Sequence, residues 1–162
     1  MKPKVYIETT IPSYLVAKPS RDVVVAGRQE LTREWWEVRR KDFSLYISQF
    51  VIDEAILGDP DMAQRRLDVI AELEQIEISD AIGVLAERII DSGAIPLKAA
   101  TDAAHIAVAA VQEMDYLLTW NCKHIANAEI SRTVRKVCEE VGLVCPVICT
   151  PEELMGEEDY EN

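Results

Sequence analysis

The sequence predicts a single α/β domain in which helices flank a central, largely parallel sheet of about five strands. Short apolar runs alternate with segments of helical periodicity, and this alternation is typical of βαβ units. Residues 103–111 are apolar except for His105, which predicts a helix buried against the sheet. Tyr116–Leu118 is a short apolar run typical of a strand that is buried on both faces.

The first half of the chain is expected to begin with a strand at residues 4–7 and to continue with a loop at residues 20–25. A helix over residues 26–41 carries Trp35 and Trp36. Adjacent tryptophans cannot share one helix face, so one is expected in the core and the other at an interface. The elements that follow are a strand at 44–48, a helix at 51–57 ended by Gly58, a helix opened by Asp59-Pro60 that continues over 61–73, a strand at 76–78 and a helix at 81–91.

The end of the chain should contain a helical turn at residues 123–126, a helix at 131–141 and a last strand at 146–149. Residues 150–153 (TPEE) have the pattern of a capping box with proline at the first helical position. We place the domain at residues 1–150 and an acidic, solvated tail at 151–162, because residues 152–162 hold six acids and no base.

The net charge of −12 opposes general electrostatic attraction to nucleic acid. The basic residues cluster at 28–41, 65–66 and 123–136. Each cluster is either a phosphate-facing patch or an ordinary solvated helix face. The second interpretation is favoured, because three glutamates interleave the first cluster at pairing distance.

Nothing in the sequence has the length of a membrane span or of a secretory signal, so we expect a cytoplasmic protein. The four cysteines lie late in the chain and form no CxxC pair. That spacing favours neither a zinc site nor a disulfide framework, and reduced structural cysteines are expected.

Three acids follow or open predicted elements: Glu8 after the first strand, Glu54 in the helix after the second, and Asp102 at a helix start. In a parallel sheet such positions can converge at the edge where α/β folds bind ligands. Hard oxygen ligands in such a cluster suit Mg²⁺ or Mn²⁺. A metal ion there would activate water and neutralise charge on a phosphodiester.

Other roles are open for several of these residues. Asp102 also suits the capping of a helix N-terminus. Asp53 competes with its neighbour Glu54 as the functional acid. His105 and His124 are more often satisfied core or surface histidines than catalytic groups.

Four segments occur in a distinctive order: YIETTIPSYL at residues 6–15, VIDE at 51–54, TDAAHIA at 101–107 and DYLLTWN at 115–121. In this order and context they resemble the PIN-domain family, which includes the VapC-type toxins of toxin–antitoxin pairs. The resemblance covers residues 4–150 and implies a five-stranded parallel sheet with an acidic site that holds Mg²⁺ or Mn²⁺ and hydrolyses RNA. It also implies a homodimer and an antitoxin protein that covers the site.

The resemblance implies roles for individual residues. Glu8, Glu54 and Asp102 match the metal-binding acids, although the family usually has aspartate where Glu8 stands. Asn121 stands where many members have a fourth acid, and we expect it to orient water or phosphate in catalysis. The hydroxyls expected to bind substrate are those of Thr9, Thr10 and Thr119.

The sequence therefore predicts a metal-dependent endoribonuclease, the toxin of a type II toxin–antitoxin pair. Glu8 reaches one methylene further than aspartate, and Asn121 removes one negative charge from the site. These departures and the acidic surface leave an alternative, a degenerate PIN-like domain that binds a protein or RNA without cleaving. A small-molecule α/β hydrolase or binder unrelated to PIN proteins is a third interpretation.

Overall fold

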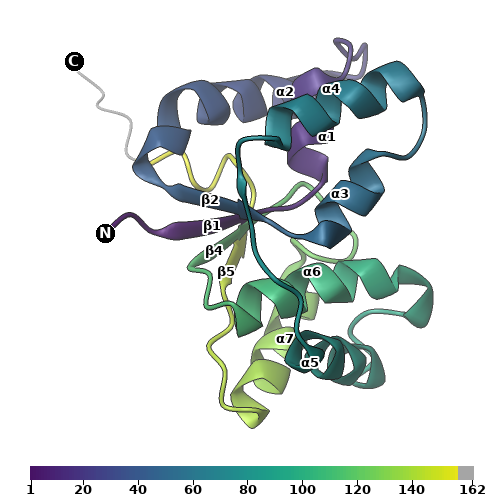
Figure 1. Cartoon of the computed structure of the whole chain (residues 1–162), viewed down its shortest axis with the longest axis vertical. Coiled ribbons are helices and arrows are strands. Elements are labelled where there is room, and N and C mark those ends of the chain that lie inside the picture. The colour runs from purple at the N-terminus through teal and green to yellow at the C-terminus, as the bar shows by residue number, and fades with distance from the viewer. Residues whose placement is uncertain (157–162) are drawn as a thin grey trace.

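A five-stranded, all-parallel sheet forms the centre of the computed structural model, which describes residues 1–156 (Figure 1). The strand order is β3-β2-β1-β4-β5, so the first strand of the chain lies in the middle. The strands are β1 (Lys4–Ile7), β2 (Ser44–Ile47), β3 (Glu74–Gln75), β4 (Tyr116–Leu118) and β5 (Val147–Cys149). This architecture confirms the predicted α/β domain with a parallel sheet.

Helices cover the sheet on two sides, with α1, α2 and α4 on one side and α5, α6 and α7 on the other (Figure 1). Helix α3 contacts both α4 and α6. The helices are α1 (Thr10–Val16), α2 (Val23–Glu34), α3 (Gln49–Ala55), α4 (Pro60–Ile70), α5 (Asp80–Asp91), α6 (Ala100–Val111) and α7 (Ala128–Glu140). Among the residues described, no helix combines the length and the apolar character needed to cross a membrane.

Helix α6 and strand β1 form the centre of the hydrophobic core. Every residue of α6 from Ala103 to Ala110 is buried, as the apolar run predicted. Its alanines allow the helix to approach its neighbours closely. Val5, Tyr6 and Ile7 of β1 are fully buried, because this central strand has helices on both of its faces.

Helix α2 begins earlier than predicted. The loop expected at residues 20–25 is wrong from Val23 onward, because the side chain of Asp22 caps the helix by accepting a hydrogen bond from Val25 N at 3.0 Å. After Glu34 the helix widens into a π-helical turn, Trp35–Arg39, followed by a 3₁₀ turn, Arg40–Asp42.

The two tryptophans of this segment divide between core and surface. Trp35 is fully buried, and its indole Nε1 donates to the carbonyl oxygen of Leu154 at 3.1 Å. Trp36 is only partly buried, with the Arg40 guanidinium 4.2 Å from its ring centroid. The predicted core tryptophan is therefore confirmed as Trp35.

The third strand lies at Glu74–Gln75, so the strand predicted at residues 76–78 is wrong. Its partner β2 ends at Ile47, and Ile47 accepts the last bond of the pair from Ile76 N at 2.8 Å. Beyond Ile47, β2 offers no further strand residue with which residues 77–78 could pair. Ile78 consequently lies exposed outside the sheet.

Two predicted features near the C-terminus also differ. Residues 123–126 form turns and not a helix, and α7 begins at Ala128 because the side chain of Asn127 caps it. The expected capping box opens only a turn, in which Glu153 Oε1 accepts from both N and Oγ1 of Thr150 at 3.1 Å. Of the predicted acidic tail, Leu154 is buried against the domain, and residues 157–162 lie outside the described residues.

Candidate active site

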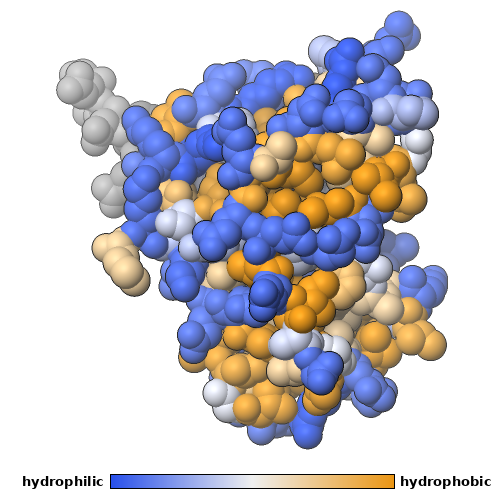
Figure 2. Space-filling view, viewed as in Figure 1, coloured by the Kyte–Doolittle hydropathy of each residue, from blue (hydrophilic) through white to orange (hydrophobic). Residues whose placement is uncertain are grey.

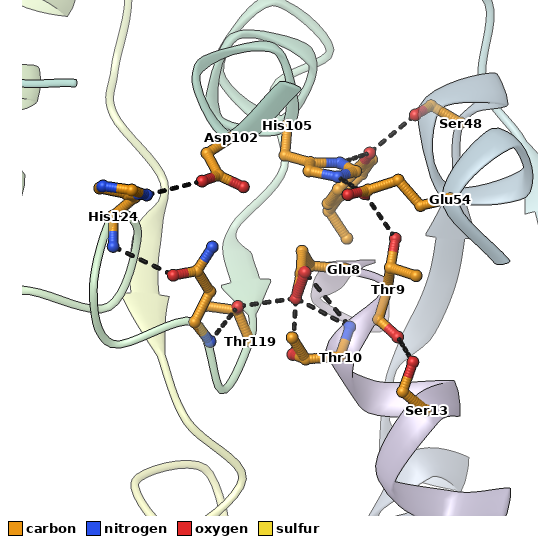
Figure 3. A network of polar contacts seen from close by, with 12 residues as sticks. Glu8, Thr9, Thr10, Ser13, Ser48, Glu54, Asp102, His105, Thr119 and His124 are labelled. Carbon is orange, nitrogen blue, oxygen red and sulfur yellow. Dashed lines mark hydrogen bonds and ion pairs between the residues drawn. The ribbon is translucent and has the colours of Figure 1, made fainter. Parts of the chain in front are cut away.

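The candidate site lies where the carboxyl ends of β1 and β4 meet. Ile7 pairs with Leu118, so the residues that follow, Glu8 and Thr119, come out of the sheet side by side. Thr119 Oγ1 donates to Glu8 Oε1 at 2.9 Å, although the two residues are 111 positions apart (Figure 3). Ligands of open parallel sheets bind at this edge.

The Glu8 carboxylate is buried and is held through one of its two oxygens. Oε1 accepts from Thr119 Oγ1 and from both N and Oγ1 of Thr10, at 2.9 and 2.5 Å. Oε2 receives only a longer contact from Thr10 N, at 3.2 Å. Burial raises the pKa of Glu8, and the charge of His105 and the hydrogen bonds of Thr10 and Thr119 oppose that rise without cancelling it.

Glu54 reaches the site from α3. Its Oε1 accepts hydrogen bonds from Thr9 Oγ1 at 2.8 Å and from His105 Nε2. Burial alone would raise the pKa of Glu54, but the hydrogen bond and charge of His105, with the Thr9 hydroxyl, lower it overall. The neighbouring Asp53 is exposed and accepts from Gln49 Nε2 at 2.8 Å, so Glu54 is the acid that faces the site.

His105 is fully buried in α6 and belongs to a chain of polar contacts. Its Nδ1 is hydrogen-bonded to Tyr6 Oη at 2.7 Å, and Tyr6 Oη is hydrogen-bonded to Ser48 Oγ at 2.7 Å (Figure 3). Potential ligand atoms of Glu8, Glu54 and His105 all lie within 4.8 Å of one another. His105 is thus a satisfied core histidine, as expected, but its contact with Glu54 was missed. The signal available in the sequence was its position three residues after Asp102, on the same face of the helix.

Asp102 occupies the other side of the site and is bonded to a second histidine. Its Oδ2 contacts His124 Nδ1 at 3.0 Å, and Asn121 Oδ1 accepts from His124 N at 3.0 Å (Figure 3). Ala99 is the N-cap residue of α6, and no side chain supplies a cap hydrogen bond there. Asp102 therefore does not cap the helix through its side chain. It is not a member of the 4.8 Å group that Glu8, Glu54 and His105 form.

The three threonines expected to bind substrate all donate hydrogen bonds to the acids. Thr9 donates to Glu54, and both Thr10 and Thr119 donate to Glu8. The oxygens of Thr10 and Thr119 also accept from backbone N–H groups, those of Trp120 and Asn121. These contacts fix the carboxylates in place, and substrate binding by the threonines stays a prediction.

Glu54 and Asp102 thus each have one oxygen engaged by the protein and one available for a ligand, and Glu8 is held mainly through Oε1, with a longer contact from Thr10 N to Oε2. The engaged atoms are Glu8 Oε1, Glu54 Oε1 and Asp102 Oδ2. Among the described residues, no partner within hydrogen-bond distance is found for Glu54 Oε2 or Asp102 Oδ1. Oxygen donors arranged in this way fit a hard divalent cation such as Mg²⁺ or Mn²⁺.

The strand order and the acids at the β1 edge define a PIN-like α/β domain. A chain of the crystal structure of VapBC2 from Rickettsia felis bound to a DNA fragment from their promoter shares this fold. The two chains are 18% identical, the match covers 91% of this chain and 98% of that chain, and the TM-score is 0.51. No protein-family model matches the sequence, and no curated protein matches it. The similarity confirms the PIN-like fold that the sequence motifs predicted.

Proposed function

We propose that this protein is a metal-dependent endoribonuclease. The observation that carries the proposal is the arrangement of Glu8, Glu54 and Asp102, whose carboxylates are held in place by hydrogen bonds from the protein. In this assignment Glu8 and Glu54 would hold Mg²⁺ or Mn²⁺, and Asp102, outside their 4.8 Å group, would add a third carboxylate to the site.

The protein's own side chains prepare the site for hydrolysis. The metal ion would supply an activated water and neutralise charge on the phosphodiester. His105 holds the Glu54 carboxylate in one orientation, and Thr10 and Thr119 do the same for Glu8. Asn121, whose Oδ1 is engaged by His124 N, can present its amide NH₂ to a water molecule or a phosphate oxygen.

We further propose that the protein is the toxin of a type II toxin–antitoxin pair, acts in the cytoplasm and forms a homodimer. The PIN-like fold it shares with a chain of a VapBC2 complex motivates this assignment. Figure 2 shows apolar side chains over the face that carries α3 and α4. Ile56 and Leu57, which follow Glu54 closely in the chain, are both more than half exposed. An apolar surface beside an acidic site suits a protein partner that covers it.

The test compares two neighbouring acids. Structured RNAs are incubated with the parent protein in Mg²⁺, Mn²⁺ or EDTA, and with the variants Glu54→Gln, Asp102→Asn and Asp53→Asn. We expect metal-dependent cleavage by the parent and by Asp53→Asn, and a loss of at least about a hundredfold in the other two, because each loses a carboxylate that serves the metal. Equal cleavage by Glu54→Gln and Asp53→Asn would reject the assignment.

The second candidate is a PIN-like domain that binds RNA or a protein without cleaving. The burial that raises the pKa of Glu8 and the missing charge at Asn121 favour it, because both weaken the attraction of the site for a cation. The two candidates differ in how thermal unfolding responds to metal. Mn²⁺ should raise the melting temperature of a nuclease, whereas a domain without a working metal site should melt alike in Mn²⁺ and EDTA.

A further inference from the structure

A pocket of about 460 Å³ lies next to the candidate active site, at the free edge of the sheet beside β5. One face of α7 forms its first wall with Ser131, Arg132 and Arg135, which are spaced to lie together on a helix. The lining also includes Ala126, Ile148 and Glu153. The pocket therefore combines basic, hydroxyl and apolar groups within one concave surface.

A single short loop connects this pocket to the acidic site. Ala126, on the pocket wall, donates from its backbone N to the carbonyl oxygen of Asn121 at 2.7 Å. The side chain of Asn121 bonds His124 N, and the His124 ring contacts Asp102 (Figure 3). A polymer bound across Glu8 and Asp102 could thus continue into the pocket by passing over this loop.

The two arginines of the pocket lack the ion pairs that some other arginines of the described residues make. Arg33 and Arg65 each pair with an acid on their own helix, Glu30 and Asp61. Within residues 1–156, neither Arg132 nor Arg135 has a carboxylate oxygen within 4.0 Å, and both are exposed. In a protein of net charge −12, two unpaired guanidinium groups in one concavity create a local anion site.

Glu153 is the acid among the described residues that line this pocket, and one of its carboxylate oxygens is engaged. Its Oε1 accepts from N and Oγ1 of Thr150. The positive charge of the two arginines therefore exceeds the negative charge of this glutamate at the pocket wall. The sequence left two interpretations open for the basic cluster at residues 123–136. Two of its bases, Arg132 and Arg135, line a concave pocket rather than a flat helix surface.

We infer that this pocket binds the backbone phosphate and an adjoining nucleoside of a single RNA strand whose cleaved bond lies at the acidic site. The inference rests on the proposed nuclease function. Guanidinium groups match phosphate geometry with paired hydrogen bonds. Ala126 and Ile148 offer an apolar surface to a sugar or base, which is exposed for such contact in a single strand.

The test measures RNA binding in a form that does not cleave. A fluorescent single-stranded RNA is titrated onto Glu54→Gln protein without divalent metal, over a range of salt concentrations. Adding Arg132→Gln and Arg135→Gln should weaken binding by about tenfold and reduce the slope of log K against log salt by about 0.7, the value for one lost phosphate contact. Glu153→Gln should tighten binding.

The matched control removes the same charge elsewhere. Arg33→Gln with Arg65→Gln also loses two positive charges, but from ion-paired surface arginines. This control should bind like the Glu54→Gln parent. Equal weakening in both double variants would overturn the inference, because general repulsion alone would then explain the loss. Binding of a polyglutamate peptide with RNA-like affinity and the same arginine dependence would overturn it too.

Failure of the pocket and failure of the nuclease give different results. If Arg132→Gln/Arg135→Gln protein with Glu54 intact cleaves RNA in Mn²⁺ with an unchanged KM, the pocket assignment is wrong and the nuclease function stands. If RNA binding depends on the arginines but the parent cleaves nothing in Mn²⁺, the pocket stands and the nuclease function is rejected.

Discussion

Buried hydrogen bonds link Ser48, Tyr6, His105 and Glu54, so the donor and acceptor roles of these groups depend on one another. The lowered pKa of Glu54 keeps its carboxylate ionised, so His105 Nε2 carries the proton of the bond between them. With a neutral imidazole, Nδ1 accepts from Tyr6 and Tyr6 accepts from Ser48; with a charged imidazolium, Nδ1 donates to Tyr6 and Tyr6 donates to Ser48. The Tyr6 hydroxyl, through its bond to Nδ1, thereby orients the His105 ring toward Glu54.

Tyr6→Phe should destabilise the protein although it changes no apolar contact of the ring. Removing the hydroxyl leaves His105 Nδ1 and Ser48 Oγ buried without partners, which costs about 1–3 kcal/mol of unfolding free energy. Denaturant unfolding in EDTA measures this loss. Adding Ser48→Ala should recover part of it, since one unpaired group disappears. Unfolding curves of Tyr6→Phe that superimpose on those of the parent would contradict the assigned network.

The predicted ends of helices and strands indicated the candidate acids, but not the residues that form hydrogen bonds with them. Glu8, Glu54 and Asp102 were identified because each stands at or near the end of an element, and element ends can be recognised from local sequence. The bonds of Glu54 to Thr9 and His105 cross 45 and 51 positions of the chain. Such pairings depend on how α1, α3 and α6 pack, which no local pattern reveals.

Among the elements, α6 has the largest influence on the site because it carries Asp102 and His105 together. Its buried face consists mainly of alanines, so the distance from the helix to its neighbours is set by small side chains. The position of both functional side chains thus depends on close packing several residues further along the same helix.

Ala107→Leu should therefore impair the site from a distance. Ala107 is fully buried, and a larger side chain there costs about 1–3 kcal/mol in stability by forcing α6 away from its neighbours. The same shift should weaken the increase of melting temperature in Mn²⁺. Glu87→Gln, at an exposed position of α5, serves as the control and should leave both quantities unchanged. A destabilised Ala107→Leu protein with a full Mn²⁺ response would show that α6 tolerates the shift.

Central elements were predictable from the sequence and peripheral ones less so. β1 and β4 are buried on both faces, and this leaves a continuous apolar run that can be read locally. The position of β3 is decided by where β2 ends, which is information from another part of the chain. The start of α2 differs from the prediction because the Asp22 side chain caps the helix, whereas the three valines that follow it have low helix propensity.

The stability of the whole protein should depend on pH through Glu54 and Glu8, whose pKa values are shifted in opposite directions. The lowered pKa of Glu54 contributes stability above its unfolded pKa, and this contribution is lost as pH falls through the folded value. The raised pKa of Glu8 acts in the other direction. Its contribution is complete below the ordinary value of 4.5 and is lost as pH rises through the folded value.

Without metal, the contribution of Glu8 to the stability of the parent protein should therefore decrease as the pH rises above about 4.5. Glu8→Gln removes this ionisation and should lack that part of the decline. Melting temperatures of both proteins in EDTA across the pH range measure the difference. Saturating Mn²⁺ should reverse the parent's decline, because a bound cation favours the ionised carboxylate. Parallel curves for the two proteins would contradict the pKa direction for Glu8.

The pairing of β1 with β4 also has a consequence for synthesis on the ribosome. Thr119, the partner of Glu8, is made 111 positions after it, and the strand beside Glu8 cannot pair earlier. Contacts this distant in sequence form late in folding. While β4 is still inside the ribosomal exit tunnel, the nascent chain already contains Glu8, but the site around Glu8 has not formed. The proposed hydrolase therefore stays inactive at least until β4 has been translated and has left the tunnel.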